Sequence, residues 1–384
     1  MTEILIVGAG AAGHSAASTL RREGFTGSIR LLHDEPGSPY NRTLVDKGIL
    51  PGLLTQEQAG LPIRHVEGLD LVPGRAVAVD PAERSVRLED GRELGFRQCL
   101  LAVGSAPRSA PDSPLNGVFP LHRAADALRI RDHVAGDFAG RSVTVLGAGL
   151  IGTEAASFFV AAGAEVHLVA RSDLPLVATL GIPIATRLRD LHREHTTFHG
   201  GRAVTSLRRA SNGGVEVRLD SGITWESDLV VTSHGTTPAT GWVSAGSTAG
   251  IGVDRSLRAD ALPRMYAAGG AVLYPWGDGT RVRVDHWDDA VAQGAHVARS
   301  MLHDLSMGED PGPYRPVSGY SVSMYGSSLT GVGIRAPGTR ARTETAAEGG
   351  LVTTFAESTG GVTGAVGWKA TRAIQALRQG IIGA

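Results

Sequence analysis

The chain has a single cysteine, Cys99, among its 384 residues. One thiol excludes an internal disulfide, a redox-active cysteine pair and an all-cysteine iron–sulfur or zinc site, and no metal site is expected. Because Cys99 stands in the apolar run 99–103, we interpret it as a small core residue rather than as a reactive thiol. Such sparse use of cysteine favours a cytoplasmic location.

Long apolar runs and an excess of charge are missing as well. No stretch approaches ~20 consecutive apolar residues, which argues against a membrane span. The chain enters an apolar strand at once, without a basic region or a cleavage site, which argues against secretion. A formal net charge of −1 argues against a surface for nucleic acid or anionic membrane. Lysine is scarce too, since the 37 basic residues include only Lys47 and Lys369, so each lysine is a candidate for a specific role.

Glycine is abundant, with 52 residues, and the first glycine cluster directly follows the apolar run 4–7. Glycines 8, 10 and 13 have the G-x-G-x-x-G spacing, and a helical pattern continues over 12–23. This spacing allows a tight strand-to-helix turn, lets backbone N–H groups approach a pyrophosphate, and lets the helix pack closely on the strand. The pattern predicts a dinucleotide-binding turn with contacts from Gly8, Gly10, Ala11, Ala12 and Gly13.

The same pattern recurs after the expected strand 142–146, before a helix that continues to about residue 162. Two complete signatures in one chain favour a flavin together with a nicotinamide. We therefore predict an α/β fold with two Rossmann-like dinucleotide-binding domains and, after residue 310, a further α+β domain. Contacts to the second cofactor are expected from Gly147, Gly149, Leu150, Ile151 and Gly152.

The residues after the second strand of each signature bear on recognition of the ribose. Glu35 follows the expected strand 29–32, where a dinucleotide fold places the acid that binds ribose hydroxyls; the alternative is a solvated turn acid. In the second signature, the strand 166–169 is followed by Arg171, which would bind a 2′-phosphate and so favours NADPH. The alternative is a solvent-facing Arg171, with Asp173 at the ribose of NADH.

Three further segments contain motifs found together in one family. Residues 38–50 read SPYNRTLVDKGIL, residues 100–108 read LLAVGSAPR, and residues 283–298 read RVDHWDDAVAQGAHVA. In that order they resemble the P-Y-D-R-P-P-L-S-K, A-T-G-x-x-P-R and R-x-E-x-W-x-x-A-x-x-Q-G segments of the FAD-dependent, NAD(P)H-using ferredoxin and rubredoxin reductase family. Residues 43–46 depart from this pattern.

The resemblance implies the pyridine nucleotide-disulfide oxidoreductase fold, in three domains. The FAD domain would comprise residues 1–108 and 235–310, the NAD(P)H domain residues 109–234, and the C-terminal α+β domain residues 311–384. In this family the last domain caps the flavin and helps to form a dimer or the surface that receives an electron carrier. A monomer and a homodimer both remain open for this chain.

The resemblance also implies roles for individual side chains. Arg42 and Lys47 would lie over the phosphates and the isoalloxazine of FAD. Glu154 would pair with Lys47 at the nicotinamide face; the alternative is an acid that satisfies a helix N-terminus. Trp287 would lie beside the isoalloxazine; the alternative is a core tryptophan at a helix start. Further cofactor contacts are implied at Ala102, Gly104, Arg108, Gly235, Gly269, Gly270, Asp285 and His286.

One position departs from the family in a way that affects the cofactor. The stretch 264–272, RMYAAGGAV, corresponds to an A-x-G-D motif whose aspartate holds the ribityl and pyrophosphate region of FAD. Gly269 matches the motif, but Gly270 stands where the aspartate is expected. Losing one charge-assisted hydrogen bond would cost about 1.5–3 kcal/mol, so weaker FAD binding is expected.

These features lead to an expected function. The chain would take a hydride from NAD(P)H through FAD and pass electrons singly to an iron–sulfur or rubredoxin-type carrier, since no cysteine pair can accept them. Lys369, Arg372 and Arg378 would face an acidic carrier, or form a solvated helix face. One alternative is an NAD(P)H oxidase or small-molecule reductase. Another is a low-turnover, flavin-binding, redox-sensing scaffold like the apoptosis-inducing flavoproteins.

Overall fold

The computed structural model describes residues 2–63, 66, 68–243, 249–277, 279–316 and 318–383. The chain divides into two compact units, each assembled from three segments. Unit 1 consists of Met1–Asn41, Glu57–Ala106 and Thr237–Tyr320, and unit 2 of Arg42–Gln56, Pro107–Thr236 and Ser321–Ala384. The boundaries of the three domains expected from the sequence stay a prediction.

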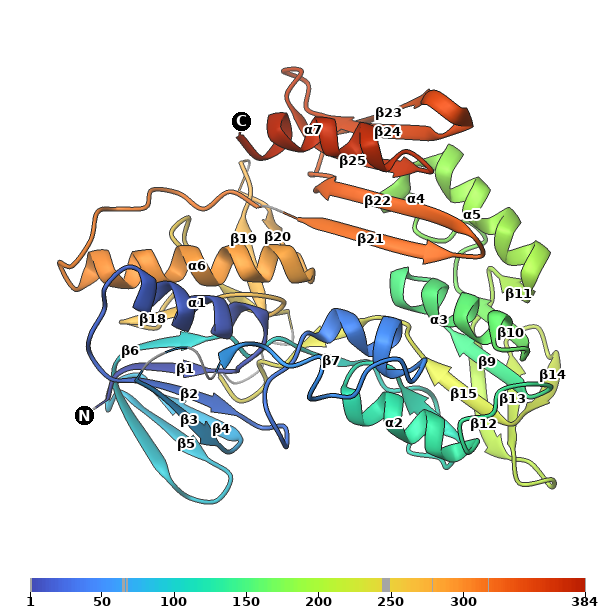
Figure 1. Cartoon of the computed structure of the whole chain (residues 1–384), viewed down its shortest axis with the longest axis horizontal. Coiled ribbons are helices and arrows are strands. Elements are labelled where there is room, and N and C mark those ends of the chain that lie inside the picture. Colours follow the sequence, from blue (N-terminus) through green and yellow to red (C-terminus); the bar gives the residue numbers. More distant parts are fainter. Residues whose placement is uncertain are drawn as a thin grey trace. The chain divides into compact units, whose positions relative to one another are not determined.

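Unit 1 is built on a mixed sheet that contains the first glycine signature (Figure 1). Its strands are β1 (Thr2–Val7), β2 (Ile29–His33), β3 (Leu69–Pro73), β4 (Ala76–Asp80), β5 (Ser85–Leu88), β6 (Glu93–Leu101) and β18 (Met265–Ala267). β1 lies between β2 and β6, and β2–β3 and β6–β18 also pair in parallel. β4 and β5 extend the sheet in antiparallel fashion from β6. Ile4, Leu5 and Ile6 are fully buried, as expected for a parallel strand covered on both faces.

Helices α1 (Ala11–Arg22) and α6 (Trp287–Asp304) pack against each other beside this sheet (Figure 1). They approach so closely that a Cβ atom on Gly294 would lie 2.1 Å from the carbonyl oxygen of Ala12. Only glycine fits at this crossing without separating the helices. A small sheet of β17 (Ile251–Gly252), β19 (Val272–Pro275) and β20 (Arg281–Val282) also belongs to unit 1.

Unit 2 contains the second glycine signature in a parallel sheet. Its strands are β8 (Val118–Pro120), β9 (Ser142–Leu146), β10 (Glu165–Ala170), β11 (Thr197–Gly200) and β15 (Leu229–Thr232), in the order β11-β10-β9-β15-β8. Before the C-terminal region, the helices of this unit are α2 (Ala124–His133), α3 (Leu150–Ala161), α4 (Val177–Leu180) and α5 (Ile182–His195). An antiparallel sheet of β12 (Val204–Arg209), β13 (Val215–Leu219) and β14 (Thr224–Ser227) follows. The central β9 is apolar and buried, like β1 of unit 1.

The segment that carries Arg42 and Lys47 also belongs to unit 2. It forms a 3-10 turn, η1 (Arg42–Leu44), and a single turn of π-helix, η2 (Val45–Ile49). The short strands β7 (Ser105–Pro107) and β16 (Thr236–Pro238), where the chain passes between the units, form a two-stranded sheet.

The C-terminal region is an antiparallel sheet with one helix, as expected from the sequence. Its elements are β21 (Gly319–Met324), β22 (Ser327–Gly333), β23 (Arg340–Thr345), η4 (Ala347–Gly349), β24 (Leu351–Ala356), β25 (Val362–Trp368) and α7 (Thr371–Gly383). Ile374 of α7 packs on Val332 and Ala365 of the sheet. The sequence predicts strands at 318–325, 329–334, 351–356 and 362–367 and a final helix at 368–379. Strand β23 is an addition to these elements, and nearly all its side chains are exposed.

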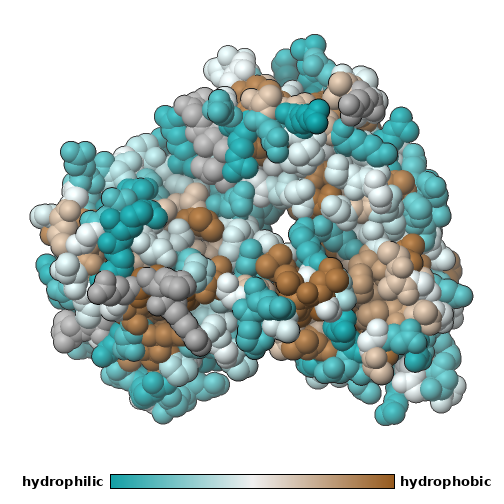
Figure 2. Space-filling view, in the orientation of Figure 1, coloured by the Kyte–Doolittle hydropathy of each residue, from teal (hydrophilic) through white to brown (hydrophobic). Residues whose placement is uncertain are grey.

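On the face drawn in Figure 2, hydrophilic residues dominate and the apolar ones form separate patches. Scattered apolar residues of this kind are ordinary for a folded surface. The apolar residues of the expected strands lie instead in buried clusters, one of which is centred on β1, β2 and β6.

Two glycines of the first signature are expected to have different roles. Gly13 allows the helix to pack closely, and Gly10 allows a ligand to approach the backbone. A Cβ atom on residue 13 would lie 1.9 Å from the carbonyl oxygen of Gly8, whereas a Cβ atom on residue 10 would meet no described atom within 4 Å. Gly13→Ala is therefore expected to lower the melting temperature by several degrees, as overpacking costs about 1–3 kcal/mol. Gly10→Ala is expected to melt within about 2 °C of wild type while binding FAD more weakly. Equal melting temperatures of the two variants would contradict this account.

Candidate functional site

The glycine turn of unit 1 has the shape of a phosphate cradle. Gly8 adopts a φ of +109°, and a Cβ atom there would lie 2.2 Å from the carbonyl oxygen of Ala102. Gly10 is the extended residue before α1, and no described side chain caps it. Ala11 and Ala12 open the helix, whose first turn carries no acid. The backbone N–H groups and the positive end of α1 thus remain available for a pyrophosphate, which satisfies the requirement of a bound dinucleotide.

Further predicted residues gather around this turn within unit 1. Gly269, with a φ of +84°, packs on Ala12, and its N–H donates to Gln293 Oε1 of α6 at 2.8 Å. Gly104, with a φ of +64°, accepts a backbone hydrogen bond from Ala239. These positions follow the carboxyl ends of β6 and β18, which is where parallel sheets bind ligands.

A carboxylate occupies the place that Gly270 leaves empty. A Cβ atom on Gly270 would lie 2.0 Å from Oδ1 of Asp285. The other oxygen, Oδ2, accepts hydrogen bonds from Ser105 Oγ at 2.9 Å and from Arg283 Nη2 at 2.7 Å. Arg283 also donates through Nε to the carbonyl oxygen of Gly270 at 2.5 Å. The carboxylate of Asp285 therefore lies against the backbone position at which the family motif has its aspartate.

The residues after Asp285 begin α6. His286 precedes the helix in an extended conformation, and its Nδ1 lies 2.5 Å from Ser318 Oγ. Burial lowers the pKa of His286, although three neighbouring aspartates oppose the shift. Trp287 is half-buried, so it is neither a full core residue nor a free surface ring. Its predicted place beside the flavin stays a prediction.

Glu35 lies just beyond the end of β2, as the sequence predicts. It is half-buried, and Tyr40 donates a hydrogen bond from its hydroxyl to Glu35 Oε2 at 2.7 Å. A phenol that orients the carboxylate gives it more order than a solvated turn acid has. Contact with a ribose stays a prediction.

The glycine turn of unit 2 repeats the geometry of the first. Gly147 has a φ of +109°, and a Cβ atom there would lie 2.6 Å from the carbonyl oxygen of Ser233. A Cβ atom on Gly152 would lie 1.9 Å from the carbonyl oxygen of Gly147, whereas one on Gly149 would meet no described atom within 4 Å. Leu150 and Ile151 begin α3, and Ile151 is 42% exposed. This turn also fits a dinucleotide.

The strand after this turn ends in a basic region. Arg171 is exposed directly after β10. Asp173 is held by α5, because its Oδ1 accepts from Arg193 Nη2 at 2.9 Å and its Oδ2 lies 3.7 Å from Arg189 Nη1. Elsewhere in unit 2, the Arg108 backbone N–H donates to the carbonyl oxygen of Gly235 at 3.0 Å.

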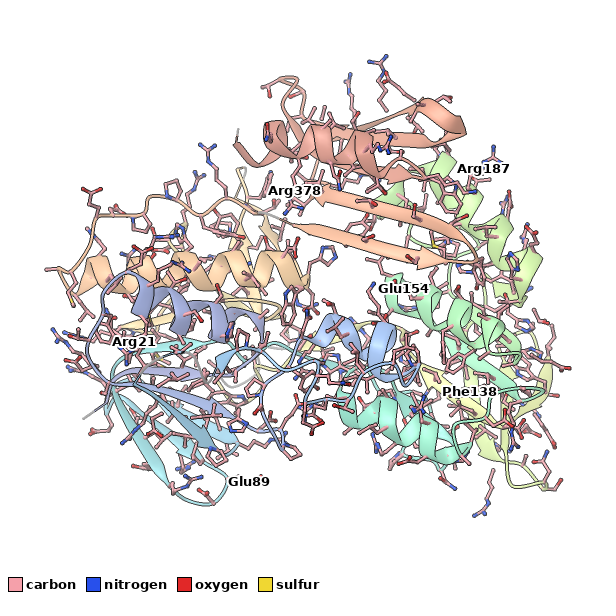
Figure 3. The ribbon with its side chains drawn as sticks, in the orientation of Figure 1. Arg21, Glu89, Phe138, Glu154, Arg187 and Arg378 are labelled. Atoms are coloured by element: carbon pink, nitrogen blue, oxygen red, sulfur yellow. The ribbon has the colours of Figure 1, made fainter. Side chains whose placement is uncertain are left out.

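The structure brings together Lys47 and Glu154, which are 107 residues apart in the chain. Lys47 Nζ donates to both carboxylate oxygens of Glu154, at 2.6 and 2.7 Å, and to the carbonyl oxygen of Ser321 at 3.0 Å. Glu154 on α3 (Figure 3) is 9% exposed, and its Oε1 accepts from the Ser323 N–H at 3.1 Å. Glu154 is thus the partner of a lysine and not a simple helix-end acid. Arg42 of the same segment donates to the carbonyl oxygen of His122 at 3.4 Å.

Asp46 precedes Lys47 on η2. The sequence suggests a role for it only in the alternative function of an NAD(P)H oxidase or small-molecule reductase, where Asp46 and Gly270 would retune the flavin. It is 4% exposed, and burial, with the charge of Glu154 next, raises its pKa to about 7 against the opposing charge of Lys47. The sequence signal for a buried acid here is the position of Asp46 between Val45 and Lys47, in a stretch that is otherwise mostly apolar. Cys99 is fully buried and burial raises the pKa of its thiol, as expected for a core residue.

None of the helices in the described part of the chain is both long and apolar enough to cross a membrane. Within the same residues, no group of three or more histidine, cysteine, aspartate or glutamate side chains has the geometry to hold a metal ion.

Known proteins resemble this chain in sequence and fold. The family model described as pyridine nucleotide-disulphide oxidoreductase matches residues 2–294. Apoptosis-inducing factor 3 of Homo sapiens is 32% identical over 319 residues, which are 78% of this chain and 51% of that protein, so the chain spans about half of that relative's length. The probable ferredoxin reductase CtmF of Castellaniella defragrans is 33% identical over 282 residues, 71% of this chain and 68% of that protein.

A solved structure extends the match to the whole chain. The crystal structure of the ferredoxin reductase for the CYP199A2 system from Rhodopseudomonas palustris has a TM-score of 0.87 at 26% identity, covering 99% of this chain and 94% of that one. Together with two glycine turns on parallel sheets and the Lys47–Glu154 pair, these matches make the chain a member of the pyridine nucleotide-disulphide oxidoreductases, in the FAD-dependent NAD(P)H:ferredoxin reductase family.

Proposed function

We propose that this chain is a cytoplasmic, FAD-dependent reductase that takes a hydride from NAD(P)H and delivers electrons singly to a ferredoxin- or rubredoxin-type iron–sulfur carrier. The observation that carries the proposal is the pair of open glycine turns, one in each unit, which suit two different dinucleotides. Bound FAD supplies the redox chemistry, since it accepts an electron pair and releases electrons one at a time. The chain itself binds and orients the two cofactors.

The FAD would be held by unit 1. The N–H groups at the start of α1 would face the pyrophosphate, and Glu35 would bind the adenosine ribose. Asp285, held by Ser105 and Arg283, would face the ribityl and pyrophosphate region in place of a side chain at Gly270. These hydrogen-bond donors and acceptors suit the phosphate and hydroxyl groups of FAD, and their contacts require no metal ion.

The nicotinamide dinucleotide would be held by unit 2, and we favour NADPH over NADH. Asp173 already binds Arg193, so it is poorly placed to accept ribose hydroxyls. Arg171 is exposed at the end of β10, where a guanidinium would bind a 2′-phosphate in a bidentate manner. Lys47 and Glu154 would present one fixed positive charge and its counter-ion to the reacting rings.

The acceptor is proposed as a separate protein because this chain has no sulfur relay. Cys99 is its single cysteine and is fully buried, so electrons cannot leave through a dithiol. The basic residues of α7, among them Arg378 (Figure 3), would suit an acidic carrier. The similarity to apoptosis-inducing factor 3 favours a second candidate, a flavin-binding scaffold with low turnover.

Anaerobic titration of the FAD-loaded protein with each nicotinamide tests the proposal. NADPH is expected to bleach the visible flavin band within seconds, and NADH is expected to need a higher concentration for the same rate. Subsequent addition of an oxidised ferredoxin should restore the band in two one-electron steps. A protein that binds FAD but is not bleached by either nucleotide would refute the reductase and favour the scaffold. Rapid restoration by oxygen or a quinone, but by no ferredoxin or rubredoxin, would favour an oxidase or small-molecule reductase.

A further inference from the structure

A buried carboxyl group lies beside the Lys47–Glu154 pair and has no role in the function proposed above. Asp46 is 4% exposed and directly precedes Lys47 on η2. Its Oδ2 has no hydrogen-bond partner among the described atoms. A buried carboxylate with an unsatisfied oxygen is costly, and such groups commonly respond by taking up a proton.

The neighbouring pair leaves Asp46 without a counter-ion of its own. Lys47 Nζ directs its hydrogen bonds to the two oxygens of Glu154 and to the carbonyl oxygen of Ser321. Glu154 receives a further hydrogen bond from the backbone of Ser323. The cluster therefore holds two carboxyl groups but one ammonium group, so that two ionised carboxylates would give it a net charge of −1.

Other elements pack on η2 without neutralising Asp46. Arg131 of α2 donates to the carbonyl oxygen of Leu50 at 3.1 Å, and Arg42 of η1 donates to that of His122 at 3.4 Å. The charges that act on the Asp46 carboxyl are those of Glu154, which disfavours ionisation, and of Lys47, which favours it. Burial adds the largest effect, and the pKa of Asp46 rises to about 7.

We propose that Asp46 is a positioning residue that sets the charge of the Lys47–Glu154 pair by holding or releasing one proton. With Asp46 protonated, the ammonium of Lys47 balances Glu154 and the cluster is neutral. With Asp46 ionised, the cluster carries one negative charge. The proton passes between the carboxyl oxygen and solvent, so the exchange needs no other reactant.

The consequence for the cofactor rests on the proposed function. If Lys47 favours the extra negative charge of reduced flavin, an ionised Asp46 opposes that effect at close range. The flavin of the wild-type protein should therefore be harder to reduce above neutral pH than below it, beyond the dependence that free flavin shows. Asp46 would act through Lys47 and Glu154 rather than by touching the substrate.

Thermal unfolding of the purified full chain between pH 5 and pH 8.5 tests whether Asp46 holds the proton. Below pH 7 the native state keeps a proton that the unfolded state releases near pH 4, so Asp46 lowers stability progressively as pH rises from 4 to 7. The difference in melting temperature between Asp46→Asn and wild type is therefore expected to shift in favour of the variant by at least about 3 °C as the pH rises from 5 to 8. Asp46→Ser should show the same pH trend if the asparagine variant folds poorly.

Asp132→Asn is the matched control, because Asp132 is an exposed aspartate on α2 of the same unit. Its melting curve should follow that of wild type at every pH. If the Asp46 variants also run parallel to wild type from pH 5 to pH 8.5, the proposal is wrong.

The midpoint potential of the bound flavin, measured over the same pH range, tests the coupling. Wild type and Asp46→Asn should agree below pH 6, and wild type should be the more negative above pH 7.5. If the midpoint potentials of wild type and Asp46→Asn coincide at all pH values, the coupling to the flavin is wrong, even if the melting series shows that Asp46 holds a proton. A protein that binds no FAD would refute the proposed function instead, and the melting series would still decide the proposal.

Discussion

Gly270→Asp is expected to weaken FAD binding by about 100-fold, although it restores the residue type found in the family motif. The new side chain would start 2.0 Å from Oδ1 of Asp285 and would set a second carboxylate beside the first. Asp285 is held by Ser105 and Arg283, so it cannot move without losing those bonds. Overpacking together with like-charge repulsion costs about 3 kcal/mol, which corresponds to the expected loss. Flavin fluorescence on titration of the apoprotein measures the dissociation constant.

The double variant Gly270→Asp/Asp285→Gly tests whether crowding by Asp285 causes the weaker FAD binding. With the Asp285 side chain removed, one carboxylate remains and has room, so FAD affinity should return to within about tenfold of wild type. Gly277→Asp is the matched control, because a Cβ atom there meets no described atom within 4 Å and the residue is exposed. If the double variant binds FAD no better than Gly270→Asp alone, Asp285 does not replace the missing aspartate.

Lys47→Ala is expected to slow bleaching of bound FAD by NAD(P)H about 100-fold, the loss typical of removing one electrostatic contact in an active site. It should also lower stability by about 1–3 kcal/mol, because Glu154 is 9% exposed and would keep a charge without its partner. Lys47 is 38% exposed, so solvent screening limits the loss to this range. Anaerobic stopped-flow absorbance measures the rate, and thermal unfolding measures the stability.

Two comparisons separate the charge of Lys47 from its structural role. Lys47→Met/Glu154→Leu should regain much of the lost stability, since Glu154 no longer leaves an unpaired charge, but not the rate of bleaching. Lys369→Ala removes the other lysine of the chain, which is exposed, and should change neither quantity. A Lys47→Ala protein that bleaches as fast as wild type would show that this lysine has no part in the reaction.

Many elements of the fold follow from local sequence patterns. The strand at 4–7 and the helix expected over 12–23 are where the periodicity puts them, as are the strand 142–146 and the helix that follows it. The edge strand β23 was not predicted, because its charged side chains are exposed and it has no apolar alternation to recognise. The π-helical turn of η2 has no sequence signal either, since it contains a glycine and two β-branched residues in five positions.

Other features of the site depend on contacts between separate segments of the chain, which local sequence patterns do not reveal. Residues 270 and 285 lie on separate segments, and neither motif alone indicates that the carboxylate of one fills the space of the other. Asp46 is a similar case, since an acid beside a lysine in the sequence suggests a surface ion pair. Burial on η2 and the proximity of Glu154 turn it into a group with a pKa near neutrality.

The sequence by itself determined that this chain binds two dinucleotides and has no dithiol through which electrons could leave. Those conclusions depend on glycine spacing over a few residues and on a count of cysteines, and both are local properties. Tertiary structure alone decided that the carboxylate of Asp285 lies against Gly270 and that Asp46 is buried beside the Lys47–Glu154 pair. The physical reason is that charge, burial and steric fit depend on neighbours that folding brings together. Lys47 and Glu154, for example, are 107 residues apart in the chain.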